Sequence, residues 1–306
     1  MRPDVWIPES TPATQRARLA DVADVRAFPL DGPLPAALGR GDILIAADDA
    51  GRALDVAPHI EGLRVIQAFS AGVDSILDRI PPGVTLCDAA GVHDVAVAEW
   101  VVMVILASQR RFAEHLDGQR AGHWRDESLT GTDLDGATVV ILGAGSIGSA
   151  VEARLAPFGA RIVRIARRPR PGVRTVDDLP AILPTADVVV SLLPLTDATR
   201  GIVDARFLAR MRDGALLVNA SRGHIVDTDA LTREVLAGRL RAALDVTDPE
   251  PLPDGHPLWT AAGAIVTPHV ASDVRAEDAR AWQLAIEQVG RYARGEPLLN
   301  VVTEGY

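Results

Sequence analysis

Residues 137–148 read A-T-V-V-I-L-G-A-G-S-I-G, and this stretch decides the fold. Its short run of Val and Ile is typical of a strand that is buried on both faces of a parallel sheet. The run ends at Gly143, Gly145 and Gly148, and a helix-like segment, A-V-E-A-R-L-A-P-F-G, follows. A G-x-G-x-x-G turn between a strand and a helix indicates a dinucleotide-binding site. A glycine-rich strand–helix turn without a ligand is the alternative.

The three glycines have separate roles in such a turn. Gly143 permits the tight turn, Gly145 lets a pyrophosphate approach the backbone, and Gly148 lets the helix pack closely on the strand. The backbone N–H groups of Ser146, Ile147 and Gly148 at the start of the helix would face the phosphates. We therefore expect these residues to bind the phosphates of a dinucleotide.

The residues after the next expected strand indicate which dinucleotide binds. Ala166 stands where an NAD enzyme usually places Asp or Glu. Arg167, Arg168 and Arg170 follow, and guanidinium groups bind a 2′-phosphate that an acid would repel. The absence of an acid at position 166 is stronger evidence for NADP(H) than the arginines are. All 31 basic residues of the chain are arginine, so a run of arginines is less informative here. We predict NADP(H) over NAD(H), with a solvated arginine run as the alternative.

The composition limits the possible functions. The 306 residues suffice for two domains, and 48% of them are hydrophobic. A formal net charge of −10 argues against nucleic acid or an anionic membrane as a partner. The chain has no lysine, which excludes a Schiff base, a Walker lysine and the Tyr-x-x-x-Lys pair of short-chain dehydrogenases.

Cysteine content and hydropathy indicate the compartment. Cys87 is the only cysteine, which excludes an internal disulfide framework and a cysteine-based metal cluster, and we expect no metal site. The first ten residues lack an apolar signal core. The longest apolar stretch, Val95–Ala107, contains Glu99 and is too short to span a bilayer. We expect a cytoplasmic protein without membrane association.

Strand and helix patterns alternate twice along the chain, which predicts parallel sheets built from right-handed crossovers. The expected strands of the first part are Val5–Ile7, Val25–Phe28, Ile43–Ala46, Arg64–Phe69 and Thr85–Cys87. Those of the second part are Thr138–Leu142, Arg161–Ile165, Val188–Leu192, Ala215–Asn219, Ala242–Leu244 and Ala264–Val266. The expected helices include Thr14–Val22, Ala96–Phe112, which starts near His93–Asp94, and Asp273–Arg294.

The last expected helix follows the final expected strand of the second part, so it does not connect two strands of that sheet. We expect it to pack back on the first domain, which makes that domain discontinuous. The fold class is therefore α/β, with two Rossmann-like, doubly wound parallel-sheet domains. The expected domains are 1–94 with 275–306, which would bind the substrate, and 95–274, which would bind the dinucleotide.

Three residues downstream of the glycines form the candidate catalytic site. Arg222 lies at the carboxyl end of an expected strand, where ligands bind in open parallel sheets, and could grip a carboxylate through two hydrogen bonds. His269 follows another strand and a proline, and an imidazole can exchange a proton near neutral pH. Glu250 could orient this ring. An isolated histidine is more often structural, but the acid and the cofactor motif favour function here.

Several motifs in a fixed order resemble the D-2-hydroxyacid dehydrogenase family across nearly the whole chain. They are G-A-G-S-I-G at 143–148, L-L-P-L-T-D-A-T at 192–199, V-N-A-S-R-G at 218–223, A-L-D-V-x-x-x-E-P-L at 243–252 and T-P-H at 267–269. The resemblance implies that Arg222 binds the substrate and polarises its carbonyl. It also implies that His269 donates the proton, with Glu250 as its partner.

The resemblance implies further contacts with the cofactor. It places Asp245 near the nicotinamide, and Ala166 matches the members that use NADPH, including glyoxylate and hydroxypyruvate reductases. The segment 194–199 forms either a wall at the adenosine or a plain loop that starts a helix. The additional residues expected to line the cofactor are Leu193, Pro194, Thr199, Ala220 and Ser221.

Two segments upstream also resemble the family. S-A-G-V-D at 70–74 is similar to the loop whose backbone N–H groups hold the substrate carboxylate, which places Ala71, Gly72 and Val73 there. An ordinary glycine turn is the alternative. H-D-V-A-V-A-E-W at 93–100 resembles the start of the helix that enters the cofactor domain, where the family often has Asn at the position of His93. His93 either faces the active site or belongs to a loop that caps the helix.

The sequence therefore predicts an oxidoreductase that transfers a hydride between NADP(H) and a small 2-oxo or 2-hydroxy acid of the glyoxylate or hydroxypyruvate kind. The family resemblance implies a homodimer. Two other functions remain: a nucleotide-sensing binding module with this fold, and a phosphoglycerate dehydrogenase-like enzyme that uses NAD. The presence of Arg222, Glu250 and His269 together favours an enzyme.

Overall fold

The computed structural model describes residues 2–34, 37–47, 50–124 and 128–303. The chain divides into two compact units, of which unit one comprises Met1–His93 with Val274–Tyr306, and unit two comprises Asp94–Asp273. Each division falls one residue before the boundary expected from the sequence. Unit one is thus assembled from two separate segments of the chain.

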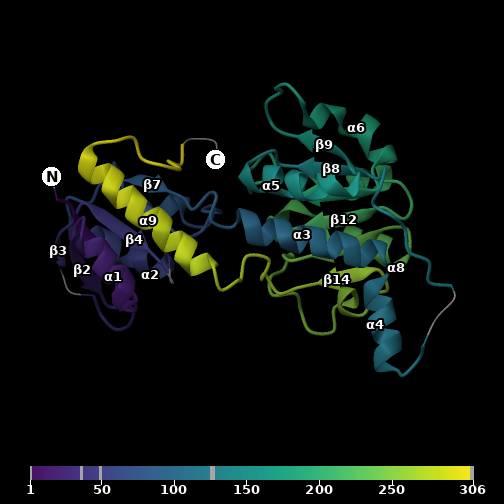
Figure 1. Ribbon diagram of the computed structural model, residues 1–306, viewed down its shortest axis with the longest axis horizontal. Coiled ribbons are helices and arrows are strands. Elements are labelled where there is room, and N and C mark those ends of the chain that lie inside the picture. Colours follow the sequence, from purple (N-terminus) through teal and green to yellow (C-terminus); the bar gives the residue numbers. More distant parts are fainter. Residues whose placement is uncertain (1, 35–36, 48–49, 125–127, 304–306) are drawn as a thin grey trace. The chain divides into compact units, whose positions relative to one another are not determined.

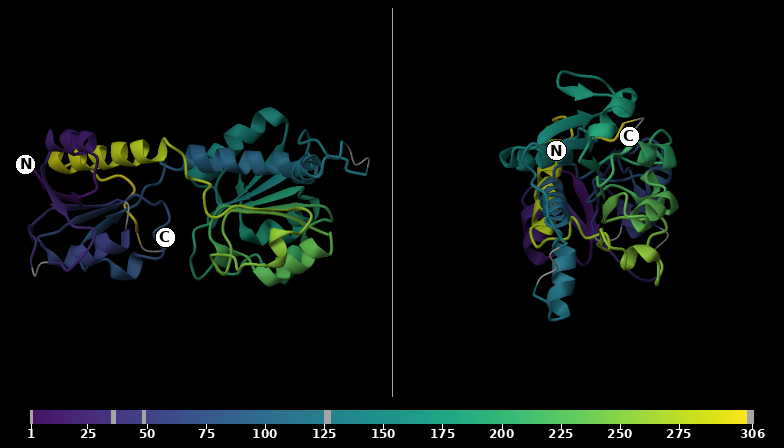
Figure 2. Two further views of the ribbon diagram at one scale, coloured as in Figure 1. Left: turned by 90° about the horizontal axis from the view of Figure 1, so that it is seen from below. Right: turned by 90° about the vertical axis from the view of Figure 1, so that its right-hand side faces the viewer.

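Unit one is built on a parallel sheet with the strand order β2-β1-β4-β6-β7. Helices α1 and α9 cover one face of this sheet and α2 covers the other (Figures 1 and 2). Neighbouring residues of β1 alternate between the faces, because Val5 packs with Trp282 of α9 and Trp6 packs with Leu54 of α2. The strands are β1 (Asp4–Pro8), β2 (Asp24–Phe28), β4 (Ile43–Ala46), β6 (Val65–Ala68) and β7 (Thr85–Cys87), and the helices are α1 (Ala13–Ala20), α2 (Ala50–Val56) and α9 (Glu277–Arg294).

Unit two is built on a parallel sheet with the strand order β10-β9-β8-β11-β12-β13-β14. Helices α3 and α5 pack on one face, and α6, α7 and α8 pack on the other. The strands are β8 (Thr138–Leu142), β9 (Arg161–Ile165), β10 (Val173–Arg174), β11 (Val188–Ser191), β12 (Leu216–Asn219), β13 (Arg241–Leu244) and β14 (Ala264–Val266). The helices are α3 (Asp94–Gln109), α4 (Phe112–Arg120), α5 (Ser146–Leu155), α6 (Leu179–Ile182), α7 (Ala205–Arg210) and α8 (Thr228–Leu236).

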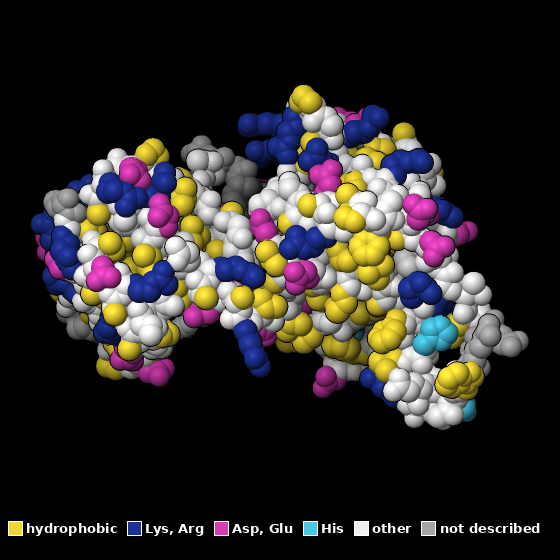
Figure 3. All heavy atoms as spheres, viewed as in Figure 1, with side chains coloured by type: hydrophobic (Ala, Val, Ile, Leu, Met, Phe, Trp, Pro, Cys, Tyr) yellow, Lys and Arg dark blue, Asp and Glu magenta, His cyan; other side chains and the backbone are white. Residues whose placement is uncertain are grey.

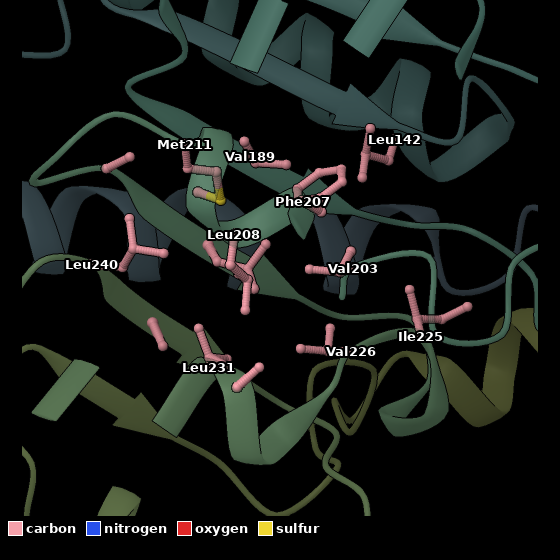
Figure 4. Close-up of a cluster of buried hydrophobic side chains, with 14 of the residues drawn as sticks. Leu142, Val189, Val203, Phe207, Leu208, Met211, Ile225, Val226, Leu231 and Leu240 are labelled. Carbon is pink, nitrogen blue, oxygen red and sulfur yellow. The ribbon is translucent and has the colours of Figure 1, made fainter. Parts of the chain in front are cut away.

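Both faces of the unit two sheet are buried, which explains its continuous apolar strands. On one face, Leu142 and Val189 lie in the same cluster as Phe207 and Leu208 of α7 (Figure 4). On the other face, Ile141 packs with residues of α3 and α5. A strand with an apolar layer on each side has no polar face, so it shows no alternation in the sequence. The expected α/β fold with two parallel sheets is confirmed.

The strand order of unit two reverses next to β8. From β8 the chain moves outward to β9 and β10, and it then returns to β11 on the other side of β8. In open parallel sheets, ligands bind outside the carboxyl ends of the strands at such a reversal. The topology thus points to the loop that follows β8.

The expected helix Ala96–Phe112, with its start placed near His93–Asp94, begins where it was expected but ends earlier than expected. Helix α3 begins at Asp94 and ends at Gln109, and Arg111 has a left-handed backbone with φ of 53° before α4 begins. The guanidinium of Arg241 donates 2.8 Å hydrogen bonds to the carbonyl oxygen of Ser108 and to Oε1 of Gln109. This contact from a distant strand takes up a carbonyl at the end of α3, and the local sequence gives no sign of it.

The last helix also begins later than expected. Helix α9 starts at Glu277 and not at Asp273, and the N–H of Glu277 donates to the carbonyl of Val274 in a preceding turn. Its first turn carries Glu277 and Asp278, whose negative charges suit the amino end of a helix. The apolar periodicity of the segment extends into this turn and so conceals the true start.

Several very short elements were not predicted from the sequence. The strands β3 (Gly39–Arg40), β5 (Ile60–Glu61) and β10 are too short to show a period of hydrophobicity. Short 3-10 helices occur at Ala57–His59, Leu77–Arg79, Ala156–Phe158, Val176–Asp178, Leu183–Thr185, Gly223–Ile225 and Pro257–Trp259.

The described part of the chain lacks two kinds of feature. None of its helices is long and apolar enough to cross a membrane. Within the same residues, no three His, Cys, Asp or Glu side chains form a group that could hold a metal ion.

The single cysteine yields a prediction about reactivity. Cys87 is buried at the end of β7, and burial together with the nearby charge of Asp88 raises the pKa of its thiol to about 12. At pH 8 only about one thiol in ten thousand would then be a thiolate, the reactive form. We expect a disulfide reagent to leave native Cys87 unmodified and to modify one thiol per chain in denaturant. Rapid reaction of the native protein would contradict this burial.

Candidate active site

Loops after neighbouring strands lie along the carboxyl edge of the unit two sheet. The glycine loop 143–148 follows β8, Arg222 follows β12, Asp245 directly follows β13, and His269 follows β14. Adjacent strands are about 4.8 Å apart, so β12 and β14 are separated by roughly 10 Å. The fold therefore gathers residues more than a hundred positions apart in the sequence at one edge.

The glycine loop leaves room where a phosphate would need it. A Cβ added to Gly143, which has φ of 106°, would meet the carbonyl of Leu192, and one added to Gly148 would overlap the carbonyl of Gly143. A Cβ added to Gly145 would meet no atom within 4 Å. Two of the glycines are thus required by packing, whereas Gly145 only keeps a space open.

That space lies at the amino end of α5. Gly145 is the N-cap of the helix, and the first helical hydrogen bond runs from the N–H of Ser149 to its carbonyl at 3.0 Å. The N–H groups of Ser146, Ile147 and Gly148 belong to the first turn, where no acceptor exists within the helix. A pyrophosphate fits this arrangement, because the N–H groups and the helix dipole both favour an anion.

The arginine run stands beside this loop. Ala166 is half-buried after β9 and its N–H donates to the carbonyl of Arg174, while Arg167 and Arg168 are exposed. Figure 3 shows basic side chains gathered over the loop that follows β9. Arg170 donates a hydrogen bond to the carbonyl of Ala144 within the glycine loop. The sequence placed Arg170 in this run but did not connect it with the glycine loop.

The segment after β11 largely supports its own turn. Leu193 is partly buried against the core, and Pro194 is exposed. The hydroxyl of Thr199 donates to the carbonyl of Pro194 at 2.6 Å and accepts from the N–H of Thr196 at 2.9 Å. The Thr199 side chain therefore closes a turn, and any contact with a nucleotide would be additional to this role.

The loop after β12 is tied to the loop after β11 by buried hydroxyls. The Oγ of Ser221 lies 2.9 Å from that of Ser191 and donates to Oδ1 of Asn219 at 2.7 Å. Ser221 is only 9% exposed, whereas Ala220 is half-buried. The Ser221 side chain thus holds the edge together, and its hydroxyl already has two protein partners.

The same loop presents Arg222 and fixes its backbone. The amide of Asn219 donates to the carbonyl of Arg222 at 2.9 Å, and the guanidinium donates to the carbonyl of Ser221 at 2.9 Å. A Cβ added to Gly223 would overlap the carbonyl of Thr247, so this loop packs directly on the one that carries Glu250. These hydrogen bonds and this packing therefore fix the backbone that carries the half-buried side chain of Arg222.

The structure brings together two of the three candidate catalytic residues. Nδ1 of His269 lies 2.6 Å from Oε1 of Glu250, and the two side chains are 51% and 41% exposed. A carboxylate only accepts, so Nδ1 carries a proton and Nε2 is the atom that can exchange one with a ligand. Exposed pairs contribute only about 0–1 kcal/mol to stability. This close contact therefore serves to orient the ring.

The backbone of His269 is unusual as well. Its φ of 56° lies in the left-handed region, which costs a residue other than glycine on the order of 1–3 kcal/mol. Asp245, only 3% exposed, stabilises this turn, because its carboxylate accepts from the Thr267 hydroxyl and from the N–H groups of Val270 and Ala271 at 2.6–2.9 Å. The sequence missed this role of Asp245, which was expected to contact the nicotinamide.

The expected substrate loop belongs to unit one. Within it, Val73 is buried in the core and Ala71 is half-buried. The N–H of Gly72 donates to Oγ of Ser70 at 3.2 Å, and this hydroxyl donates to the Gly72 carbonyl at 2.9 Å. An incoming carboxylate would thus compete with Ser70 for the Gly72 N–H.

His93 lies next to this loop within unit one. Its Nε2 is 3.0 Å from the carbonyl oxygen of Phe69, and its Nδ1 is 3.0 Å from Oε1 of Glu277. The side chain is 9% exposed and makes its contacts with these two residues. The partners of the ring therefore both belong to unit one.

Comparison with known proteins gives a consistent result. Residues 102–271 match the family described as D-isomer specific 2-hydroxyacid dehydrogenase, NAD binding domain. The chain is 33% identical to glyoxylate reductase/hydroxypyruvate reductase from Homo sapiens, over 96% of each protein. It is 34% identical to D-3-phosphoglycerate dehydrogenase from Mycobacterium leprae, over 96% of this chain and 57% of that protein.

The solved structures agree with the sequence relatives. The crystal structure of NADPH-dependent glyoxylate/hydroxypyruvate reductase from Sinorhizobium meliloti, in complex with NADP and sulfate, matches with a TM-score of 0.82. The sequences are 28% identical, and the match covers 98% of each chain. The similarity thus extends over both units.

Gly145 and Gly148 form a matched pair for testing the glycine loop. Gly145→Ala adds a methyl group to open space, so we expect unchanged thermal stability and a Kd for the dinucleotide that rises about tenfold or more, which is 1.4 kcal/mol. Gly148→Ala forces a methyl group into backbone and should destabilise the fold by about 1–3 kcal/mol. Calorimetric melting and a binding titration measure both. Unchanged dinucleotide affinity in Gly145→Ala would exclude a phosphate over this residue.

Proposed function

Because the chain belongs to the D-isomer specific 2-hydroxyacid dehydrogenase family, and is therefore an oxidoreductase with a nicotinamide dinucleotide cofactor, we propose that it reduces small 2-oxo acids with NADPH. The proposed substrates resemble glyoxylate and hydroxypyruvate. One observation carries the proposal: His269 is held in a left-handed turn with Nδ1 2.6 Å from Glu250. This pair lies on the sheet edge that carries the glycine loop.

In this proposal His269 is the proton donor. When bound, the cofactor supplies a hydride to the carbonyl carbon of the substrate. His269, as imidazolium, donates the Nε2 proton to the carbonyl oxygen as that atom gains negative charge. Glu250 accepts the Nδ1 proton in a hydrogen bond, which fixes the orientation of the ring. The same pair accepts a proton when the reaction runs in the opposite direction.

Arg222 has the complementary role of binding the substrate. Its guanidinium can donate two parallel hydrogen bonds to a carboxylate and polarise the neighbouring carbonyl. The Asn219 and Ser221 contacts support this assignment, because they fix the backbone from which the side chain extends. Because the backbone of Arg222 is fixed, little conformational entropy is lost when the side chain binds a substrate, which favours precise orientation of the substrate.

The preference for NADP(H) rests on residues 166–170. Ala166 places no carboxylate at the end of β9, where an acid would repel a 2′-phosphate. Arg167 and Arg168 are exposed beside it and can bind that phosphate. The Sinorhizobium meliloti structure with NADP supports the same choice.

A second candidate keeps the reaction type and changes the substrate and cofactor. The similarity to D-3-phosphoglycerate dehydrogenase favours a phosphorylated hydroxy acid with NAD. The matched region spans 57% of that relative. Ala166 favours the first candidate, because NAD enzymes of this fold usually have an acid there.

We also propose that the protein acts as a homodimer. Met103 of α3, Phe112 of α4 and Trp124 are 53%, 58% and 100% exposed, and Figure 3 shows apolar side chains gathered over α3 and α4. Large apolar side chains that cluster on a surface usually mark an interface. Since most oligomers are symmetric assemblies of identical chains, a second copy is the proposed partner.

A spectrophotometric comparison tests the proposed reaction. We expect the purified protein to oxidise NADPH in the presence of glyoxylate or hydroxypyruvate, with a higher kcat/KM than for 3-phosphohydroxypyruvate. We also expect kcat/KM with NADPH to exceed that with NADH, because Ala166 and the arginines favour the extra phosphate. A strong preference for NADH would overturn the interpretation of residues 166–170. Reduction of the phosphorylated acid alone would favour the second candidate.

Variants of the histidine pair test the proposed mechanism. His269→Ala should lower kcat by about 10²–10⁴-fold, the usual contribution of a general acid, and leave the Kd for NADPH nearly unchanged. Glu250→Gln keeps an oxygen near Nδ1 but removes the charge, so it should lower kcat by a smaller factor. The control is His256→Ala, which removes a histidine from the cap of a 3-10 helix. Full turnover in His269→Ala would refute the assignment.

A further inference from the structure

The contacts of His93 indicate a function that neither the fold nor the family match assigns. The residue is the last one of the first segment of unit one, and its side chain is buried. Both ring nitrogens face oxygen atoms at 3.0 Å, one from the carbonyl of Phe69 and one from the carboxylate of Glu277. Buried polar groups with such partners usually fix the conformation of the segments that they join.

The direction of the Phe69 contact follows from its chemistry. A carbonyl oxygen only accepts, so Nε2 of His93 must carry the proton and donate it. Phe69 immediately precedes segment 70–74, whose turn is closed by the two hydrogen bonds between Ser70 and Gly72. The hydrogen bond from His93 therefore fixes the point at which this turn leaves β6.

The side chain of Phe69 is fixed separately. Its ring meets the ring of Trp282 edge to face, with centroids 5.0 Å apart, and Trp282 is 1% exposed. Phe69 also packs against the buried residues Ala89 and Val92. Apolar contacts thus hold the ring of Phe69, and His93 holds its carbonyl, which sets the plane of the following peptide.

Glu277 holds the other side of the imidazole. It is the first residue of α9, and its carboxylate lies 3.0 Å from Nδ1 without the alignment of a good hydrogen bond. The contact is an ion pair when both ring nitrogens carry a proton. It connects the imidazole with α9, which packs on the same sheet.

We propose that His93, supported by Glu277, is a positioning residue that holds segment 70–74 in the conformation that binds the substrate carboxylate. This inference rests on the proposed function and on the family resemblance, which places the substrate carboxylate at the N–H groups of Ala71, Gly72 and Val73. His93 acts through the Phe69 carbonyl and does not itself contact the substrate. Loss of this contact should weaken substrate binding much more than it slows turnover.

Two conservative variants separate the two contacts of the ring. In His93→Gln the amide nitrogen reaches about as far as Nε2 and can still donate to Phe69. In His93→Asn the shorter amide takes the place of Nδ1 and leaves the Phe69 carbonyl without its donor. We expect His93→Asn to raise the KM for the 2-oxo acid about tenfold, with kcat within about threefold of wild type, since a hydrogen bond contributes about 0.5–1.5 kcal/mol. His93→Gln should stay near wild type.

A matched control excludes a general loss of stability. Thr11→Val removes another buried side-chain donor in unit one, the Thr11 hydroxyl that bonds the Pro8 carbonyl at 2.7 Å. It should lower the melting temperature by a similar amount to His93→Asn and leave KM unchanged. If Thr11→Val raised KM equally, or if His93→Asn and His93→Gln gave the same KM, the positioning role would be refuted.

Hydrogen–deuterium exchange gives a readout that needs no activity. Amide exchange in segment 70–74 should be several-fold faster in His93→Asn than in wild type, and unchanged in His93→Gln and Thr11→Val. Equal exchange in all four proteins would overturn the inference whatever the substrate is. If the wild-type protein reduces no 2-oxo acid while exchange changes as expected, the proposed function fails and the contact between His93 and the segment stands.

Discussion

The buried carboxylate of Asp245 is the interaction on which the candidate active site depends. Its oxygens accept from the Thr267 hydroxyl and from the N–H groups of Val270 and Ala271, all within 2.6–2.9 Å. Hydrogen bonds to a charged group contribute about 1.5–3 kcal/mol each, which offsets the cost of the left-handed backbone of His269. Without this anchor the turn would relax, and the imidazole would lose the position in which it meets Glu250.

The other loops of this edge are braced in a similar way, by contacts that run across strands. Ser191 and Ser221 join the loops after β11 and β12 through their hydroxyls. Gly223 lies against the carbonyl of Thr247, which joins the loops after β12 and β13. The loops after β11, β12 and β13 are thus joined to one another. Loops joined in this way hold catalytic groups in place at little entropic cost.

The sequence predicted what depends on local pattern and missed what depends on distant contacts. The strands were recognisable because burial on both faces demands Val, Ile and Leu, and the glycine loop because two of its glycines have no room for a Cβ. The end of α3 was missed because Arg241, far along the chain, binds its last turn. The roles of Asp245 and Arg170 were missed for the same reason, since their partners are more than twenty residues away.

The two histidines singled out by the sequence differ in the way that their proposed roles require. A proton donor must reach its ligand, and His269 is half exposed with one nitrogen turned to Glu250, which leaves Nε2 for the substrate. A positioning residue gains from the opposite environment, because burial strengthens its hydrogen bonds and excludes competing water. His93 is buried, with Nε2 bonded to the Phe69 carbonyl and Nδ1 facing the Glu277 carboxylate at 3.0 Å. Exposure and the partners of the ring nitrogens therefore distinguish the two roles, although the sequence shows only a histidine in each place.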